Sequence, residues 1–99
     1  MVTVAVLARF EAKPGNEGHI QRFFDSGLAI VEGQPSTTMW IAFRIGPTTY
    51  GAFAAFASEK DRDALLAAGG PKLSSEFAGL FEHPPSFEKA DVLMARLPR

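Results

Sequence analysis

The side chains that could do chemistry are few in this sequence. It has two histidines and no cysteine, so thiolate metal sites and cysteine nucleophiles are excluded. His19 stands beside the apolar Ile20 of a predicted helix and could act as a general base. An exposed histidine at the start of a helix is the simpler alternative. His83 precedes two prolines and favours a solvent-facing role. The histidines have no carboxylate at ligand spacing, so no metal site is predicted.

A second group of candidates belongs to two predicted strands. Trp40 and Arg44 are four residues apart, which places both side chains on one face of a strand. The indole could stack on a planar ligand, and the guanidinium could hold an enolate, phenolate or carboxylate. A core tryptophan beside an arginine that pairs with an acidic residue is the alternative. Tyr50 opens the next strand, where its phenol could meet a substrate or simply lie in water.

The tight loop between these two strands sets which residues face each other. A symmetric loop pairs Arg44 with Gly51 and Ala42 with Phe53, so that Phe53 shares a face with Trp40. Small residues among them would leave space for a ligand. The predicted site therefore has Trp40 and Phe53 as walls, Arg44 as the anion-stabilising group, and His19 or Tyr50 as the proton acceptor.

The elements that must position these residues follow from the apolar periodicity. In order, they are a strand over 2–12, a helix over 17–33, strands over 37–45 and 50–56, a helical region from Ser58 that breaks at Gly69-Gly70 and resumes at Pro71, and a strand over 86–97. This β-α-β-β-α-β order predicts an α+β fold of the ferredoxin-like type, a four-stranded antiparallel sheet with helices on one face. Residues 1–99 are expected to form one domain.

The predicted strands are apolar on both sides. The side chains of residues 2–8 point alternately to two faces, and both faces are largely apolar. Residues 50–56 are almost entirely Ala, Phe and Gly. A sheet covered by helices on one face only should be polar on the other face. We therefore expect a homodimer in which two sheets pack face to face about a two-fold axis, as in a dimeric α+β barrel.

Composition narrows the classes of partner. The chain has 99 residues, 46% of them hydrophobic and 21% charged, with a net charge of −1. Disorder is excluded, and the scattered Lys and Arg argue against nucleic-acid binding. No apolar run approaches the ~18 residues that a membrane span needs, and Met1 leads directly into a strand. A cytoplasmic protein with no membrane contact is expected.

Several stretches also resemble a known family. Residues 9–15 (RFEAKPG), the Phe23-Phe24 pair, residues 38–44 (TMWIAFR) and the Ala- and Phe-rich third strand are similar to the antibiotic biosynthesis monooxygenases, which are dimeric α+β barrels. The resemblance spans nearly the whole chain. It implies a homodimer with one cleft per subunit, between the helices and the sheet.

The same resemblance implies a cofactor-independent monooxygenase that uses no metal or flavin. Its substrate would be a small electron-rich aromatic or quinone-like molecule. The residues by themselves leave two points open. A non-catalytic dimeric barrel that binds a small hydrophobic ligand, or has a structural role, is the alternative function. The spacing of Trp40 and Arg44 also leaves open whether they face the helices or the other side of the sheet.

Overall fold

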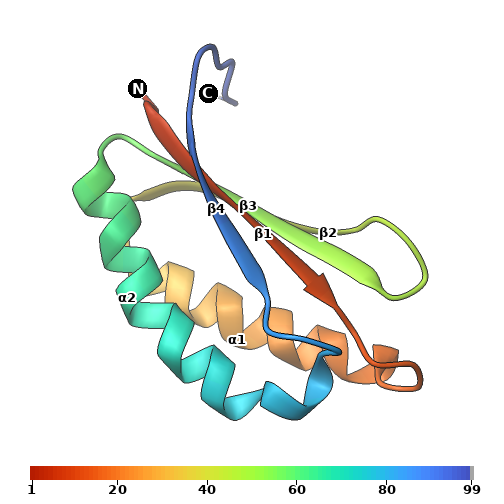
Figure 1. Ribbon diagram of the computed structural model, residues 1–99. Coiled ribbons are helices and arrows are strands. Elements are labelled where there is room, and N and C mark those ends of the chain that lie inside the picture. The colour runs from red at the N-terminus through yellow and green to blue at the C-terminus, as the bar shows by residue number, and fades with distance from the viewer. Residues whose placement is uncertain (99) are drawn as a thin grey trace.

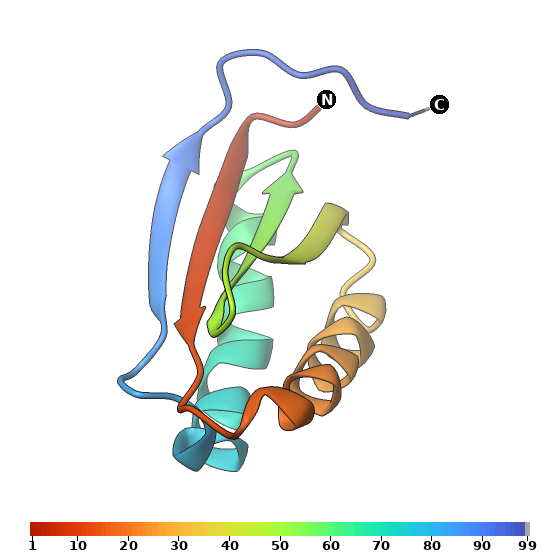
Figure 2. The same cartoon turned by 90° about the vertical axis from the view of Figure 1, so that its right-hand side faces the viewer.

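The structure is a computed structural model that describes residues 1–98. Its elements are β1 (Val4–Glu11), the short 3-10 helix η1 (Glu17–His19), α1 (Ile20–Glu32), β2 (Thr37–Arg44), β3 (Thr49–Phe56), α2 (Glu59–Glu76), the 3-10 helix η2 (Ala78–Leu80) and β4 (Ser86–Asp91). The four strands form one antiparallel sheet in the order β2-β3-β1-β4. Both long helices cover the same face of this sheet (Figures 1 and 2). The predicted ferredoxin-like α+β fold is confirmed.

The side chains of β1 alternate between two faces, and the helices cover one of them. Four alternate residues, Val4, Val6, Ala8 and Phe10, are buried beneath the helices. The residues between them belong to the other face, which we call the open face. At one end of the open face, Val2, Ala5 and Ala55 form a small cluster with residues of the C-terminal segment. The period of two therefore assigns every strand residue to one of two environments.

An aromatic cluster holds the helices on the sheet. The Phe10 ring contacts those of Phe23, Phe24, Phe81 and Phe87, with centroid separations between 5.0 and 6.3 Å. These four rings come from α1, from the segment after η2 and from β4. One side chain of β1 thus ties both helical regions and the edge strand together at one end of the sheet.

The second helix differs from its prediction. Ser58 caps it as expected, since its hydroxyl accepts a hydrogen bond from the Asp61 N–H at 3.3 Å. The predicted break at Gly69-Gly70 is wrong, because α2 runs unbroken with Pro71 inside it. Gly69 lies against Ile30 of α1, where an added Cβ would be 3.4 Å from the Ile30 side chain. Packing between the two helices outweighs the low helix propensity of these residues. None of the helices within residues 1–98 is long and apolar enough to cross a membrane.

The last strand is shorter than predicted. It ends at Asp91, which pairs with Val4, the first residue of β1. One more backbone hydrogen bond follows, from the Val92 N–H to the Thr3 carbonyl at 2.9 Å, and the prediction of a strand to Leu97 is wrong. Val92 and Leu97 instead pack against the cluster on the open face.

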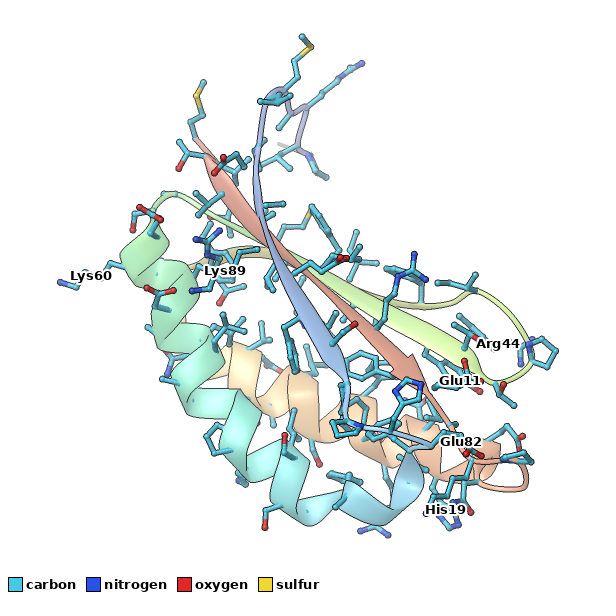
Figure 3. The ribbon with its side chains drawn as sticks, viewed as in Figure 1. Glu11, His19, Arg44, Lys60, Glu82 and Lys89 are labelled. Atoms are coloured by element: carbon cyan, nitrogen blue, oxygen red, sulfur yellow. The ribbon has the colours of Figure 1, made fainter. Side chains whose placement is uncertain are left out.

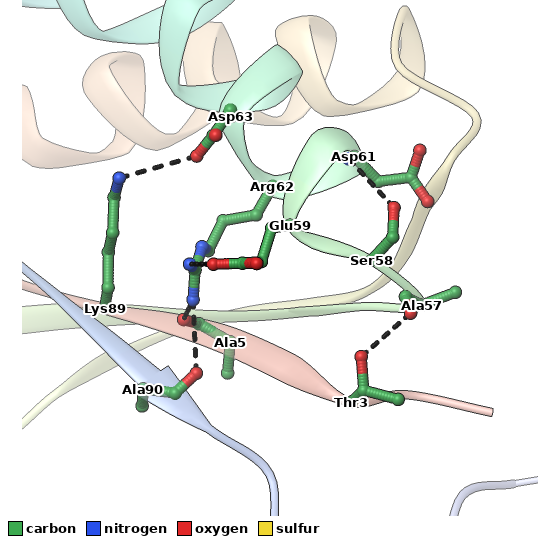
Figure 4. A network of polar contacts seen from close by, with 10 residues as sticks. All are labelled: Thr3, Ala5, Ala57, Ser58, Glu59, Asp61, Arg62, Asp63, Lys89 and Ala90. Carbon is green, nitrogen blue, oxygen red and sulfur yellow. Dashed lines mark hydrogen bonds and ion pairs between the residues drawn. The ribbon is translucent and has the colours of Figure 1, made fainter.

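A buried arginine fastens the edge strand. Arg62 of α2 is only 5% exposed, and its Nη1 donates hydrogen bonds to the carbonyl oxygens of Ala5 at 3.1 Å and Ala90 at 3.2 Å (Figure 4). These two residues are paired across β1 and β4. Glu59 lies 3.5 Å from Nη2 and compensates part of the buried charge. The arginine therefore links α2 to both strands.

We predict that Arg62→Met loosens β4. Losing charge-assisted hydrogen bonds should lower the free energy of unfolding by about 1.5–3 kcal/mol, and amide exchange should rise more in β4 than in β2 and β3. Lys89→Met is the matched control, because Lys89 lies on β4 and also pairs with α2, through Asp63. This ion pair is more than half exposed and should be worth ~1 kcal/mol or less. Urea unfolding and amide hydrogen exchange measure both effects. An equal loss in the two variants would contradict this role for Arg62.

Candidate functional site

A cavity of about 90 Å³ lies between the two helices and the sheet. Small residues on both sides create the space: Ala8, Ala52 and Ala54 on the sheet, and Gly27, Gly69 and Gly70 on the helices. Larger apolar side chains surround them. We call this space the apolar cavity. It lies on the helix side of the sheet, where the family resemblance implies a cleft.

Trp40 forms one wall of the apolar cavity. Its indole lies over Gly27 of α1, where an added Cβ would be 3.4 Å from Trp40 Cζ2. The Phe24 ring meets it edge to face at 6.4 Å. The absence of a side chain at Gly27 therefore lets the indole approach the helix. Trp40 is the only tryptophan of the chain, so its spectroscopic signals report on this cavity alone.

Phe53 does not share a face with Trp40. The predicted hairpin register is wrong by one residue, because Trp40 pairs with Ala54, Arg44 with Tyr50, and Phe53 with Ile41. A shift of one residue moves a side chain to the other face of a strand. The cause is the loop, in which the Ile45 and Gly46 N–H groups both donate to the Thr49 carbonyl and make the turn one residue tighter. Phe53 therefore belongs to the open face and does not line the apolar cavity.

The other predicted site residues do not line the apolar cavity either. Arg44 is exposed at the end of β2, and His19 is exposed at the start of α1 (Figure 3). Tyr50 is buried, 6% exposed, and packs edge to face on Phe24 at 6.2 Å. The structure therefore brings Trp40 to the cavity and leaves Arg44, His19, Tyr50 and Phe53 outside its walls.

The walls of the apolar cavity carry almost no polar chemistry. Among the lining residues, only Ser74 and the indole of Trp40 have a polar side-chain atom, and none has an ionisable group. Across residues 1–98, no three His, Asp or Glu side chains gather as a metal site would require. The cavity can hold and desolvate an apolar ring system, but it cannot exchange a proton with one.

Ionisable groups lie beside this cavity, in a hollow of about 240 Å³ that we call the polar hollow. It is lined by Ser74, Ala78, Phe81, Glu82, His83, Pro84 and Pro85. Ser74, Phe81 and Pro85 also line the apolar cavity, so the two spaces adjoin. His83 is exposed, as the sequence interpretation expected, but that interpretation did not foresee that it lines this hollow. The signal was the two prolines after His83, which turn the chain back toward β4.

Glu11, the last residue of β1, is held in its ionised form. It accepts a hydrogen bond from the Thr48 hydroxyl and another, at 2.6 Å, from the Thr49 hydroxyl. Chiefly these hydrogen bonds, with a smaller contribution from the charge of His83, lower the pKa of the Glu11 carboxyl below its usual value. Its carboxylate is therefore engaged by β3, and no ion pair joins it to Arg9 within the part of the chain that the structure describes.

We predict that Gly70→Leu closes the apolar cavity to ligands. Gly70 lines the cavity and a Cβ there meets no atom within 4 Å, so the new side chain can occupy the space without breaking the fold. Naphthalene should bind roughly tenfold more weakly or not at all. The single indole N–H peak of Trp40 in a ¹H–¹⁵N NMR titration measures binding.

Gly79→Leu is the matched control for this substitution. Its Cβ also meets open space, but Gly79 lies outside the cavity walls. This variant should bind naphthalene as the unmodified chain does. If both variants bound naphthalene equally well, the ligand would have to lie elsewhere.

Comparison with known proteins shows which solved structures share this fold. No family model and no curated protein matches the sequence. Among solved structures, the NE2512 protein of unknown function from Nitrosomonas europaea is 40% identical, with a TM-score of 0.90 over 100% of this chain and 97% of that one. SnoaB, a cofactor-independent oxygenase from Streptomyces nogalater, was solved as a mutant and is 17% identical, with a TM-score of 0.76 over 98% of each chain. A putative antibiotic biosynthesis monooxygenase from Caulobacter crescentus is 14% identical, with a TM-score of 0.79 over 94% of this chain and 92% of that one. The resemblance seen in the sequence is thus confirmed in the fold: the chain belongs to one family with NE2512 and has the antibiotic biosynthesis monooxygenase fold.

Proposed function

We propose that the protein is a cofactor-independent monooxygenase that oxidises a small electron-rich aromatic or quinone-like molecule. The observation that carries the proposal is the apolar cavity itself, walled by Trp40 and placed between the helices and the sheet. The fold shared with SnoaB, described as a cofactor-independent oxygenase, supports the choice of reaction. Because fold alone does not fix chemistry, the cavity and its ligand are what the experiments must test.

The proposed chemistry balances without an added reductant. When a ring methylene becomes a carbonyl, one oxygen atom of dioxygen joins the carbon. The other oxygen atom leaves as water with the two hydrogens of the methylene. The electrons come from the two carbon–hydrogen bonds of the substrate, so the protein must supply only a dry cavity, orientation and a route for a proton. The apolar walls provide the first two.

The size of the apolar cavity limits the substrate. Its volume of about 90 Å³ is below the ~300 Å³ at which drug-sized ligand pockets begin. A molecule of one or two rings therefore fits only partly, and a larger one must protrude or spread α1 from α2. Protrusion is possible on the side where Pro85 and Phe87 line the cavity, because both residues belong to the partly exposed edge of the sheet.

A non-catalytic binding protein is the second candidate function. The observation that favours it is the lack of any ionisable side chain on the cavity walls. Such a protein would bind the same apolar molecules and leave them unchanged. Both candidate functions therefore predict binding of an apolar molecule, but only the monooxygenase consumes oxygen.

We also propose that the chain forms a homodimer through the open face. Ile41 is 51% exposed and Phe43 36% exposed on this face, and Leu7 and Phe53 are partly exposed beside them. An apolar surface of this kind on a small domain favours association, and a second copy offers the same surface about a two-fold axis. The sheets would then pack face to face.

We predict oxygen uptake in metal-free and flavin-free protein supplied with anthrone or the smaller oxindole, each of which has an oxidisable ring methylene. Gly70→Leu should lower the rate roughly tenfold, and Gly79→Leu should leave it unchanged. An oxygen electrode measures the rate, and ¹⁸O₂ should label the new carbonyl. Binding of these compounds without oxygen uptake would support the binding protein and contradict the monooxygenase.

We predict that Ile41→Glu converts the homodimer into a monomer, because it places a charge at the centre of the apolar interface. Ile45→Glu is the matched control, since Ile45 is 55% exposed but follows the end of β2. Sedimentation equilibrium should give twice the 10.7 kDa of one chain for the unmodified protein and for Ile45→Glu. A monomer for the unmodified protein at micromolar concentration would contradict the proposal.

A further inference from the structure

We propose that the polar hollow is a second subsite, which binds the hydroxyl group of an aromatic ligand whose rings lie in the apolar cavity. This inference rests on the proposed function, because it takes the apolar cavity as the ligand site. It adds the chemical class of the ligand, a phenol-type molecule, and the residues that recognise it.

The two spaces share part of their lining. Ser74 of α2, together with Phe81 and Pro85, borders both the apolar cavity and the polar hollow. A ligand too large for about 90 Å³ therefore has a neighbouring volume of about 240 Å³ on this side. The Ser74 hydroxyl lies at the border, where it can donate or accept a hydrogen bond.

The polar hollow is built on backbone that is tied to the sheet. The Glu82 N–H donates to the Glu11 carbonyl at 2.9 Å, and the Lys13 N–H donates to the Leu80 carbonyl at 2.9 Å. Phe81 also forms a bridge with Ala12. The segment before His83 thus continues the sheet for a few residues. A subsite supported in this way is organised before a ligand arrives, which reduces the entropic cost of binding.

His83 supplies a hydrogen-bond acceptor to the hollow. Its Nδ1 lies 3.4 Å from the Pro84 carbonyl oxygen. Because a carbonyl only accepts, Nδ1 is the donor in this weak contact, and Nε2 is the ring nitrogen left for a ligand. A ligand hydroxyl can donate to that nitrogen. In this arrangement His83 accepts the hydrogen bond from the ligand hydroxyl. The sequence had assigned the role of proton acceptor to His19 or Tyr50.

The charges around the hollow select a hydroxyl over a carboxylate. Glu82 lines the hollow and is exposed, and Glu11 lies within electrostatic reach of the hollow, because the charge of His83 contributes to the lowered pKa of the Glu11 carboxyl. Figure 3 shows Glu11 and Glu82 near the same end of the sheet. Two carboxylates repel an anionic ligand, whereas a neutral hydroxyl can donate to a carboxylate or to an imidazole nitrogen. The apolar cavity accepts the rings of that same molecule.

The test compares 2-naphthol, naphthalene and 2-naphthoate, which share one ring system. We expect 2-naphthol to bind roughly five- to tenfold more tightly than naphthalene, the value of one hydrogen bond, and 2-naphthoate to gain no such advantage. The Trp40 indole peak reports on the cavity. The ring signals of His83 report on the hollow and should move with 2-naphthol only, while those of His19 should not move.

His83→Ala should remove the advantage of 2-naphthol and leave the affinity for naphthalene unchanged, which also shows that the variant is folded. His19→Ala is the matched control and should retain the advantage. If naphthalene shifts the Trp40 peak but 2-naphthol binds no more tightly, or if His83→Ala retains the advantage, the second subsite is wrong and the cavity remains. Tightest binding of 2-naphthoate overturns the hydroxyl assignment. If no probe shifts the Trp40 peak, the proposed function and this inference both fail.

Discussion

The packing of aromatic rings around Phe10 is the contact on which the arrangement of this molecule depends. Phe10 lies near the end of β1, an inner strand of the sheet, and rings from α1, from the segment after η2 and from β4 converge on it. Each edge-to-face or stacked pair adds to the burial of large apolar surface. This cluster closes one end of the space between the layers. The remaining space between the helices and the sheet is bounded by the elements that this cluster holds in place.

The apolar cavity is the consequence of small residues beside this cluster. Alanines on the sheet and Gly69 and Gly70 on α2 leave the space between the layers unfilled. A well-packed core would place larger side chains there, because unfilled volume lowers stability. Gly27 serves the same arrangement differently, since it lets the Trp40 indole lie against α1. The space thus depends on small residues of four elements, β1, β3, α1 and α2. Leaving such a space unfilled lowers stability, as is common at binding sites.

The separation of apolar and ionisable groups follows from the cost of desolvating charge. The cavity walls exclude every ionisable side chain, whereas Glu82 and His83 occupy the hollow at its side, where water reaches them. The buried Arg62 is the exception: its two Nη atoms meet two backbone carbonyls and Glu59, while its Nε has no hydrogen-bond partner. A ligand with an apolar body and one polar group matches this division, because each part meets an environment that suits it.

The sequence by itself determined the order of the elements and the place of Trp40 as a candidate, because periods of two and 3.6 residues are local properties. Tertiary structure decided the rest. One residue of loop geometry moved Phe53 away from Trp40, and contact with α1 kept α2 unbroken through Gly69. The polar hollow joins Ser74 to His83 across a turn of the chain. No spacing rule predicts such a meeting, since it depends on how the chain folds back between η2 and β4.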